Sequence, residues 1–215
     1  LAGFPMTHAS AYAVVLDAVV HDPAPVWQSP FRDVVPGDWY YDAVAYVHQN
    51  GLMNGSGGAF SVSAPATRGQ LAAILHRMAG QPAPAAAAGF QDVAADAYYR
   101  DAVAWAAERG IVSGYAGGRF APDRPVTREQ LAAFLFRYAN AQDMAAAADT
   151  GALKDFTDRS AVSAYAVEPL SWAVEQGLVN GYADGRLNPQ GQATRAQIAA
   201  ILSRFHRASE EWKQQ

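Results

Sequence analysis

The chain has 215 residues, of which 51% are hydrophobic and 17% charged, a balance typical of a globular protein with a substantial core. The net charge of -4, without a run of lysine or arginine, argues against a non-specific nucleic-acid binder, which needs a basic surface to neutralise phosphates. The absence of cysteine excludes thiolate metal sites, thiol catalysis and disulfides, and favours an exported protein. No segment reaches the roughly 18 apolar residues that a membrane-spanning helix needs.

The first thirty residues do not share the pattern of the rest of the chain. Residues 11–16, Ala-Tyr-Ala-Val-Val-Leu, have the composition of a strand, and residues 22–25, Asp-Pro-Ala-Pro, that of a linker. We expect residues 1–30 to be a short β-like tail that ends an upstream β-domain. The alternative is an ordered tail that packs on the domain that follows.

From residue 31 onward one pattern occurs three times. Each copy opens with Phe-x-Asp, continues with an amphipathic segment ending at a glycine, and closes with Thr-Arg-x-Gln and an apolar stripe. We assign repeat 1 to 31–80, repeat 2 to 89–140 and repeat 3 to 155–207, with a C-terminal tail at 208–215. A Pro/Ala-rich linker spans 81–89, and an Ala-rich linker spans 140–152, where partial helix is expected.

The first helix of repeat 1 is predicted from Asp38, as its N-cap, to about Asn50, with an apolar face at a spacing of 3.6 residues. In each repeat we expect a glycine in the left-handed conformation to end this helix, and the Leu or Ile that follows it to supply the hydrophobic contact of such a cap. Aromatic residues on such helix faces usually lie in the core. We therefore expect four of them to be buried: Trp39, Tyr98, Trp105 and Trp172.

The second helix opens with Thr-Arg-x-Gln, which predicts a capping box: Thr accepts from the third backbone N–H, and Gln accepts from the backbone N–H of Thr. The arginine is unexpected, because a cation in the first turn interacts unfavourably with the helix dipole and destabilises the helix by about 0.3–1 kcal/mol. An anion there would gain from unpaired backbone N–H groups, from the dipole and from the guanidinium. The sequence therefore predicts anion sites, separate or sharing a cleft, at Arg68, Arg128 and Arg195.

The apolar stripes of the three second helices cannot be buried singly. The simplest closed solution is a central helical bundle with approximate threefold symmetry. We therefore predict an all-α fold, a pseudo-threefold trimer of helix-loop-helix repeats within a monomeric chain.

Two structural alternatives stay open for the candidate residues. The arginines either meet a ligand or pair with the carboxylates of the Phe-x-Asp phrases and lock neighbouring repeats, and one guanidinium can do both. The tyrosines beside the loop glycines either stack on sugar rings or plug a junction. No histidine spacing predicts a metal site, and no catalytic motif is present, so we expect no metal, no cofactor and no enzymatic activity. His48 is expected to face solvent.

Phe-x-Asp, Gly-Leu/Ile, Gly-Tyr-x-x-Gly-x-Phe-x-Pro and Thr-Arg-x-Gln in three tandem units together resemble S-layer homology domains over about residues 31–207. The resemblance implies three helix-loop prongs with grooves between them. It also implies non-covalent binding of a secondary cell-wall polysaccharide of a Gram-positive envelope, often through a pyruvylated amino sugar, with the arginines facing the ketal carboxylate. The protein would then be extracellular, anchored at the cell wall.

Repeat 1 departs from this pattern by having Ser56 where the others have tyrosine, and its groove matches the family least well. The alternative function is a structural self-assembly or protein-docking module of the envelope. The predicted ligand-binding residues are Arg68, Arg128, Arg195, Asp33, Asp92, Asp158, Gln70, Gln130, Gln197, Ser56, Tyr115 and Tyr182.

Overall fold

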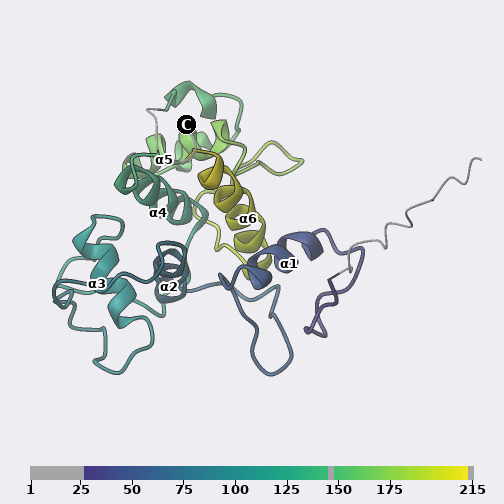
Figure 1. Cartoon of the computed structure of the whole chain (residues 1–215). Coiled ribbons are helices and arrows are strands. Elements are labelled where there is room, and N and C mark those ends of the chain that lie inside the picture. Colours follow the sequence, from purple (N-terminus) through teal and green to yellow (C-terminus); the bar gives the residue numbers. More distant parts are fainter. Residues whose placement is uncertain (1–26, 145–147, 213–215) are drawn as a thin grey trace, which may run out of the picture.

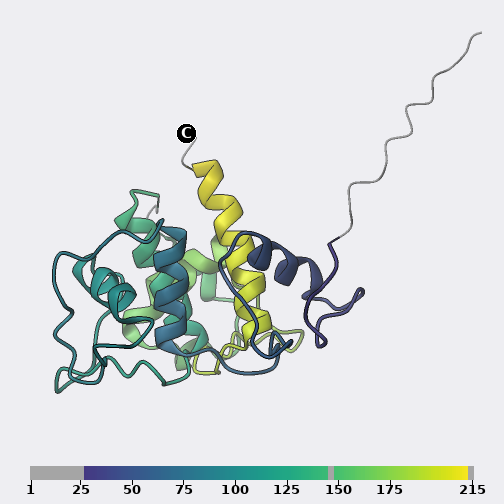
Figure 2. The same ribbon diagram turned by 60° about the horizontal axis from the view of Figure 1, so that its bottom comes forward.

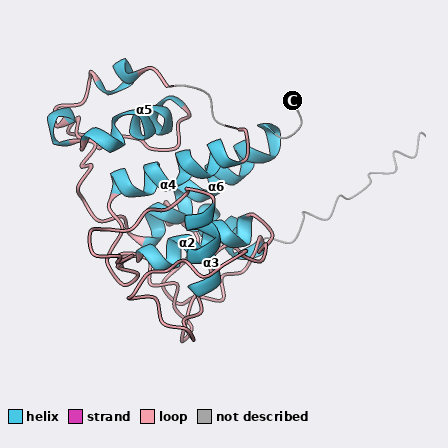
Figure 3. Ribbon diagram, turned by 90° about the vertical axis from the view of Figure 1, so that its left-hand side faces the viewer, coloured by secondary structure: helices cyan, strands magenta, loops and turns pink. Residues whose placement is uncertain are grey.

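The structure is a computed structural model that describes residues 27–144 and 148–212. Its α-helices are α1 (Tyr41–Gln49), α2 (Arg68–Met78), α3 (Arg100–Glu108), α4 (Arg128–Ala141), α5 (Val167–Glu175) and α6 (Arg195–Trp212) (Figure 1). Three 3-10 helices, Thr150–Leu153, Arg159–Ala161 and Ala164–Ala166, precede α5. The described residues contain isolated β-bridges and no strand, so the predicted all-α class is confirmed (Figure 3). The predicted strand at 11–16 and the linker at 22–25 lie outside the described residues.

The short first helix of each repeat packs against the long second helix of another repeat. Helix α3 of repeat 2 lies on α2 of repeat 1, and α5 of repeat 3 lies on α4 of repeat 2. Helix α1 of repeat 1 lies on α6 of repeat 3, as Figure 2 also shows. The helix contacts therefore run from repeat to repeat in a cyclic order, and the last repeat returns to the first.

Backbone hydrogen bonds join all three repeats just before the second helices begin. The Ala66 N–H donates to the Ala193 carbonyl at 3.1 Å, the Ala193 N–H to the Val126 carbonyl at 3.0 Å, and the Val126 N–H to the Ala66 carbonyl at 2.9 Å. All three residues are fully buried. Because these groups satisfy one another in a closed ring, no polar backbone atom of this set is left unpaired in the core.

The core contains the apolar stripes of α2, α4 and α6, as the sequence predicted. Leu71, Leu131 and Ile198 are the equivalent positions of these stripes, and each is fully buried. Aromatic rings connect the helices: Tyr138 of α4 lies edge-on to Phe205 of α6, with ring centroids 5.8 Å apart. Such burial of large apolar side chains is the main favourable term in the folding of the domain.

The helix ends follow local sequence signals. In α2 the Gln70 N–H donates to the Thr67 hydroxyl at 3.3 Å and the Thr67 N–H to the Gln70 side-chain oxygen at 3.2 Å, and the same two bonds open α4 and α6. The three capping boxes are thus confirmed. At the other end of the first helices, the predicted left-handed glycines have φ of +64° to +67°: Gly51, Gly110 and Gly177.

The predicted start of the first helix at Asp38 is wrong. Helix α1 begins at Tyr41 and its N-cap is Tyr40. The Asp38 carboxylate instead accepts from the Val35 N–H at 2.8 Å, and its carbonyl accepts from the Tyr41 N–H at 3.0 Å. Asp38 therefore closes the turn that leads into the helix.

Candidate functional site

Each arginine of the Thr-Arg-x-Gln phrase extends from its own helix to a loop of the next repeat. The Arg68 guanidinium donates from Nε to the Phe120 carbonyl at 2.9 Å and from Nη2 to the Ser113 carbonyl at 2.8 Å. The same pair of bonds joins Arg128 to Leu187 and Asn180, and Arg195 to Phe60 and Asn54. Because a guanidinium carries five N–H donors, three remain on each arginine after these two bonds.

Arg68 and Arg128 are buried and Arg195 is half-buried, and all three guanidiniums remain charged. Arg68 is only 3% exposed, and burial lowers the pKa of all three side chains from the usual arginine value, although arginine remains protonated in proteins. Aromatic faces lie over them: the Arg68 guanidinium carbon is 4.8 Å from the Tyr115 ring centroid, and that of Arg128 is 5.0 Å from the Tyr182 ring centroid. The cation–π attraction offsets part of the lost hydration.

The helix N-termini are not open to an anion, and this part of the sequence prediction is wrong. The Arg68 N–H donates to the Arg124 carbonyl at 3.0 Å, the Gly69 N–H to the Pro122 carbonyl at 2.8 Å, and the next N–H to the capping threonine. The corresponding amides of α4 and α6 are bonded in the same way. The loop of the neighbouring repeat takes the place of the expected anion, so the arginine side chains are the donors left for a ligand.

The aspartates of the Phe-x-Asp phrases brace loops of their own repeats. The Asp92 carboxylate accepts from the Phe120 N–H at 2.7 Å and from the Ala121 N–H at 2.8 Å. Asp33 and Asp158 bind the equivalent amides. No ion pair joins these carboxylates to the Thr-Arg arginines in the described part of the chain, so the alternative in which they lock neighbouring repeats by such pairs is not what the structure contains.

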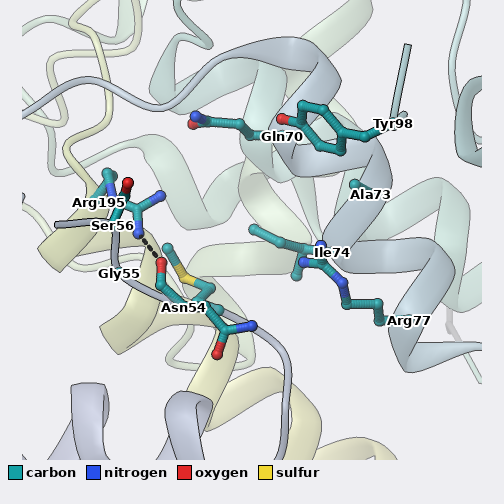
Figure 4. Close-up of a pocket in the computed structure, with 10 residues that line it drawn as sticks. Asn54, Gly55, Ser56, Gln70, Ala73, Ile74, Arg77, Tyr98 and Arg195 are labelled. Atoms are coloured by element: carbon teal, nitrogen blue, oxygen red, sulfur yellow. Dashed lines mark hydrogen bonds between the residues drawn. The ribbon is translucent and has the colours of Figure 1, made fainter. Parts of the chain in front are cut away.

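Two hollows lie where these arginines meet the second helix of the following repeat. The Ser56 groove has a volume of about 300 Å³ and is lined by Arg195, Arg77, Gln70, Ser56 and Tyr98, among others (Figure 4). The Tyr115 groove has a volume of about 240 Å³, and its polar lining is equivalent: Arg68, Arg137, Gln130, Tyr115 and Tyr165. Each groove thus holds two guanidiniums, and none of the described residues that line either groove is acidic.

The two grooves differ at one wall. The Gln130 side-chain amide donates to the Tyr115 hydroxyl at 3.1 Å, and Gln197 donates to Tyr182 in the same way at 3.2 Å. In repeat 1 the tyrosine is replaced by Ser56, which is too short to form this contact with Gln70. The amide–phenol wall of the Tyr115 groove is therefore absent from the Ser56 groove.

The second arginine of each groove was not among the predicted residues. These arginines are Arg77 and Arg137, which follow the Thr-Arg arginine of their own repeat by nine positions (68 to 77 and 128 to 137), and Arg204 follows Arg195 by the same interval in repeat 3. Their recurrence at the same place in three repeats is a signal that the sequence does contain. The partner arginine in the same groove comes from a different repeat, however, and that pairing is visible only in the fold.

The prediction that Trp39 and Tyr98 are core residues is wrong, because both are 67% exposed. They lie two residues before the first residue of α1 and α3, so they are outside the helical turns whose spacing suggested burial. Tyr98 and its counterpart Tyr165 line the grooves. Trp105 and Trp172 are buried, as predicted.

Glu129 is a buried carboxylate without a counterpart in the other repeats, which have Gly69 and Ala196 at this position. It is 2% exposed and accepts from the Ser163 N–H at 3.0 Å, the Ser163 hydroxyl at 2.8 Å and the Tyr165 hydroxyl at 2.9 Å. Burial and the hydrogen bond from the Tyr165 hydroxyl to Glu129 raise the pKa of Tyr165. Glu129 therefore fixes one wall of the Tyr115 groove.

The remaining predictions concern histidine, metals and membranes. His48 does not face solvent as predicted, because its ring packs edge-on against Phe31 with centroids 5.0 Å apart. The described residues include no cluster of three or more histidines and carboxylates that could hold a metal ion. None of the helices in the described ranges has the length and apolar character to cross a membrane.

Comparison with known proteins identifies the repeats. The family model of the S-layer homology domain matches residues 30–72, 89–132 and 155–199. An endoglucanase of Bacillus sp. (strain KSM-635) is 30% identical over 176 residues, which are 81% of this chain and 18% of that protein. The surface-layer 125 kDa protein of Lysinibacillus sphaericus is 37% identical over 118 residues, 54% of this chain and 10% of that protein.

A cellulosome-anchoring protein of Acetivibrio thermocellus is 30% identical over 96 residues, 44% of this chain and 21% of that protein. The chain therefore spans less than a quarter of the length of each of these relatives. The family and the surface-layer and anchoring relatives together support a location at the cell surface and a role in anchoring there. The chain belongs to the S-layer homology domain family, of which it carries three tandem repeats.

Proposed function

We propose that the Ser56 and Tyr115 grooves anchor the protein by binding an acidic sugar of a secondary cell-wall polysaccharide, with a pyruvylated amino sugar as the ligand unit. One observation carries the proposal: in a chain of net charge -4, the described residues that line each groove include two guanidiniums and no carboxylate. Such a groove attracts an anion locally although the molecule as a whole repels it.

The groove chemistry suits a carboxylate attached to a sugar ring. The N–H donors that remain on the Thr-Arg arginine are held in place by its two carbonyl bonds and can bind both oxygens of a carboxylate. The tyrosine at the outer wall, Tyr98 or Tyr165, offers an aromatic face to the apolar side of a sugar. Gln70 and Gln130 add side-chain amides to the same lining.

Arg77 and Arg137 are the residues to change in a binding test, because Arg68 and Arg195 also join repeats. Arg137 donates to the Ser113 hydroxyl at 3.5 Å, and Arg77 donates to the Leu52 carbonyl at 3.1 Å. We expect Arg77→Gln with Arg137→Gln to weaken the binding of purified wall polysaccharide, measured by isothermal titration. Each lost charge-assisted contact should weaken binding by about 1.5–3 kcal/mol.

Arg100→Gln with Arg109→Gln is the matched control, since it removes the same two charges at exposed positions outside both grooves. Unchanged affinity in the double variant would show that the grooves are not the binding site. Pulldown on wall preparations before and after mild acid, which removes ketal-linked pyruvate, tests the ligand unit. Retention that survives the acid treatment would favour a protein-docking or self-assembly module, or a ligand without pyruvate.

A further inference from the structure

One position in each repeat controls how far the Thr-Arg arginine of a neighbouring repeat is covered. This position holds Ser56 in repeat 1, Tyr115 in repeat 2 and Tyr182 in repeat 3. The Ser56 N–H donates to the Ala59 carbonyl at 2.9 Å. In the same way the Tyr115 N–H donates to the Arg119 carbonyl at 2.7 Å. The backbone therefore holds this residue alike in the two grooves, and the side chain makes the difference.

Where the position holds tyrosine, the ring covers the guanidinium. Tyr115 lies over Arg68, which is 3% exposed. Tyr182 lies over Arg128, which is 5% exposed. Arg195, in the groove that has serine at this position, is only half-buried. The exposure of each Thr-Arg arginine thus follows the residue at this position.

The glutamine of each groove differs in the same sense. The Gln130 side-chain nitrogen donates to the Tyr115 hydroxyl at 3.1 Å, and this bond holds the ring over Arg68. Among the described residues, the Gln70 side-chain nitrogen has no hydrogen-bond acceptor, while the Gln70 oxygen is used in the capping box. The Ser56 groove therefore offers a ligand both an accessible guanidinium and an amide donor (Figure 4).

We propose that the residue at this position sets the affinity of a groove for an acidic sugar, and that the Ser56 groove is the tighter of the two sites. The inference rests on the proposed function, because it ranks two grooves that both bind the ligand. A carboxylate that enters the Ser56 groove reaches Arg195 directly. In the Tyr115 groove it reaches Arg68 only after the phenol has left its bond to Gln130 and its place over the guanidinium.

The covering tyrosine weakens binding because two interactions are broken before the carboxylate is bound. One is the contact of a cation with an aromatic face, and the other is a neutral hydrogen bond. Together they correspond to about a tenfold difference in Kd. This order is the reverse of the one that the repeat pattern suggests, since the groove with Ser56 matches the family least well.

The test uses the full 215-residue chain labelled with ¹⁵N and two probes. The acidic probe is the methyl glycoside of N-acetylglucosamine carrying a pyruvate ketal, and the neutral probe is the same glycoside without the ketal. The backbone N–H signals of Ser56 and Tyr115 in NMR spectra report the two grooves separately. We expect the Kd of the acidic probe measured at Ser56 to be about tenfold lower than that measured at Tyr115.

Tyr115→Ser should lower the Kd of the acidic probe in its groove about tenfold, because the carboxylate then reaches Arg68 freely. It should not strengthen the binding of the neutral probe. Ser56→Tyr should raise the Kd of the acidic probe in the other groove by a similar factor. Tyr115→Phe keeps the ring but loses the bond to Gln130, so its gain should be smaller. Tyr182→Ser is the matched control, since it makes the same change outside both grooves and should leave both Kd values unchanged.

The outcomes separate this inference from the proposed function. Equal Kd values in the two grooves, or an unchanged Kd in Tyr115→Ser, would overturn the ranking and leave the proposed function standing. An equal gain for the neutral probe would show that Tyr115 only fills space, which would contradict the role given to Arg68. Signals that do not move with the acidic probe would also overturn the ranking, and the proposed function would fail with it if the Arg77/Arg137 double variant still bound the polysaccharide.

Discussion

At the scale of single residues, the charged residues that recur in the three repeats have two different roles. The aspartates and the Thr-Arg arginines bind backbone groups: Asp92 accepts from loop amides, and Arg68 donates to carbonyls of the same loop region. The second arginines, such as Arg137, make weaker contacts and line the grooves. Substituting the first class tests folding, and substituting the second class tests binding.

Glu129 is expected to stabilise the contact between repeats 2 and 3. Glu129→Ala removes a buried acceptor of three hydrogen bonds and leaves Ser163 and Tyr165 without it, which should lower the unfolding free energy by about 1–3 kcal/mol. Urea denaturation measures this loss. Tyr165→Phe, which removes one donor but keeps the ring, should have a smaller effect; equal effects of the two changes would contradict the role given to the carboxylate.

The loop brace at Asp92 predicts a dependence of stability on pH. Burial raises the pKa of Asp92, but hydrogen bonds from the Phe120 and Ala121 amides outweigh it, and the pKa lies below its usual value of 3.8. A depressed pKa contributes stability that is fully present above the unfolded value and is lost as the pH falls through the folded pKa.

Asp92→Asn should therefore be destabilising at pH 7, and the difference from the wild type should shrink below about pH 4. Chemical denaturation at a series of pH values measures both. The Asn side chain keeps one acceptor oxygen but turns an amide towards one loop N–H. If the stability difference between Asp92→Asn and the wild type stayed constant down to about pH 2.5, below ordinary carboxyl titration, the role of Asp92 in bracing the loop would be contradicted.

At the scale of the elements, the short first helices depend on their glycine ends. At the end of α3, the Gly110 N–H donates to the Ala107 carbonyl and the Ile111 N–H donates to the Ala106 carbonyl. These are the paired bonds of a helix that ends at a glycine in the left-handed conformation. The Ile111 side chain that follows is fully buried. The turn therefore directs the chain from the helix into the core.

Gly110→Ala should lower the unfolding free energy by about 1–2 kcal/mol, because an L-residue at φ +67° is strained. A Cβ at this position would meet no atom within 4 Å, so the loss would be conformational and not steric. Thermal unfolding checks the value. Gly110→Asn, which tolerates this conformation better, should lose less than Gly110→Ala, and the opposite order would contradict the explanation.

At the scale of the whole molecule, the cyclic order of contacts makes the three repeats depend on one another. Helix α2 supports α3, α4 supports α5, and α6 supports α1. The buried ring formed by Ala66, Val126 and Ala193 needs a residue from each repeat. No repeat can therefore bury its apolar stripe or pair its backbone without the other two.

Removing repeat 3 should thus abolish cooperative folding of the other two repeats. A chain ending at residue 144 keeps the α2–α3 contact but loses the partner helices of α1 and α4. We expect a broad urea transition and weak amide protection in hydrogen exchange, compared with one sharp transition for the full chain. A sharp transition in the truncated chain would show that the ring of contacts is not needed.

The sequence by itself determined the helices, their capping boxes, their glycine ends and the membership of the family, because these depend on residues within a few positions of one another or on a pattern repeated three times. It did not determine which donors remain for a ligand. The amides at the start of α2 are bonded by Pro122 and Arg124, and Arg195 is bonded by Phe60, which is 135 residues away. The tertiary structure alone decided these partners, and with them the pairing of arginines in each groove and the exposure of Trp39 and Tyr98. The physical reason is that hydrogen bonds and buried faces between repeats depend on how distant parts of the chain pack together, and the spacing of residues along the sequence does not specify that packing.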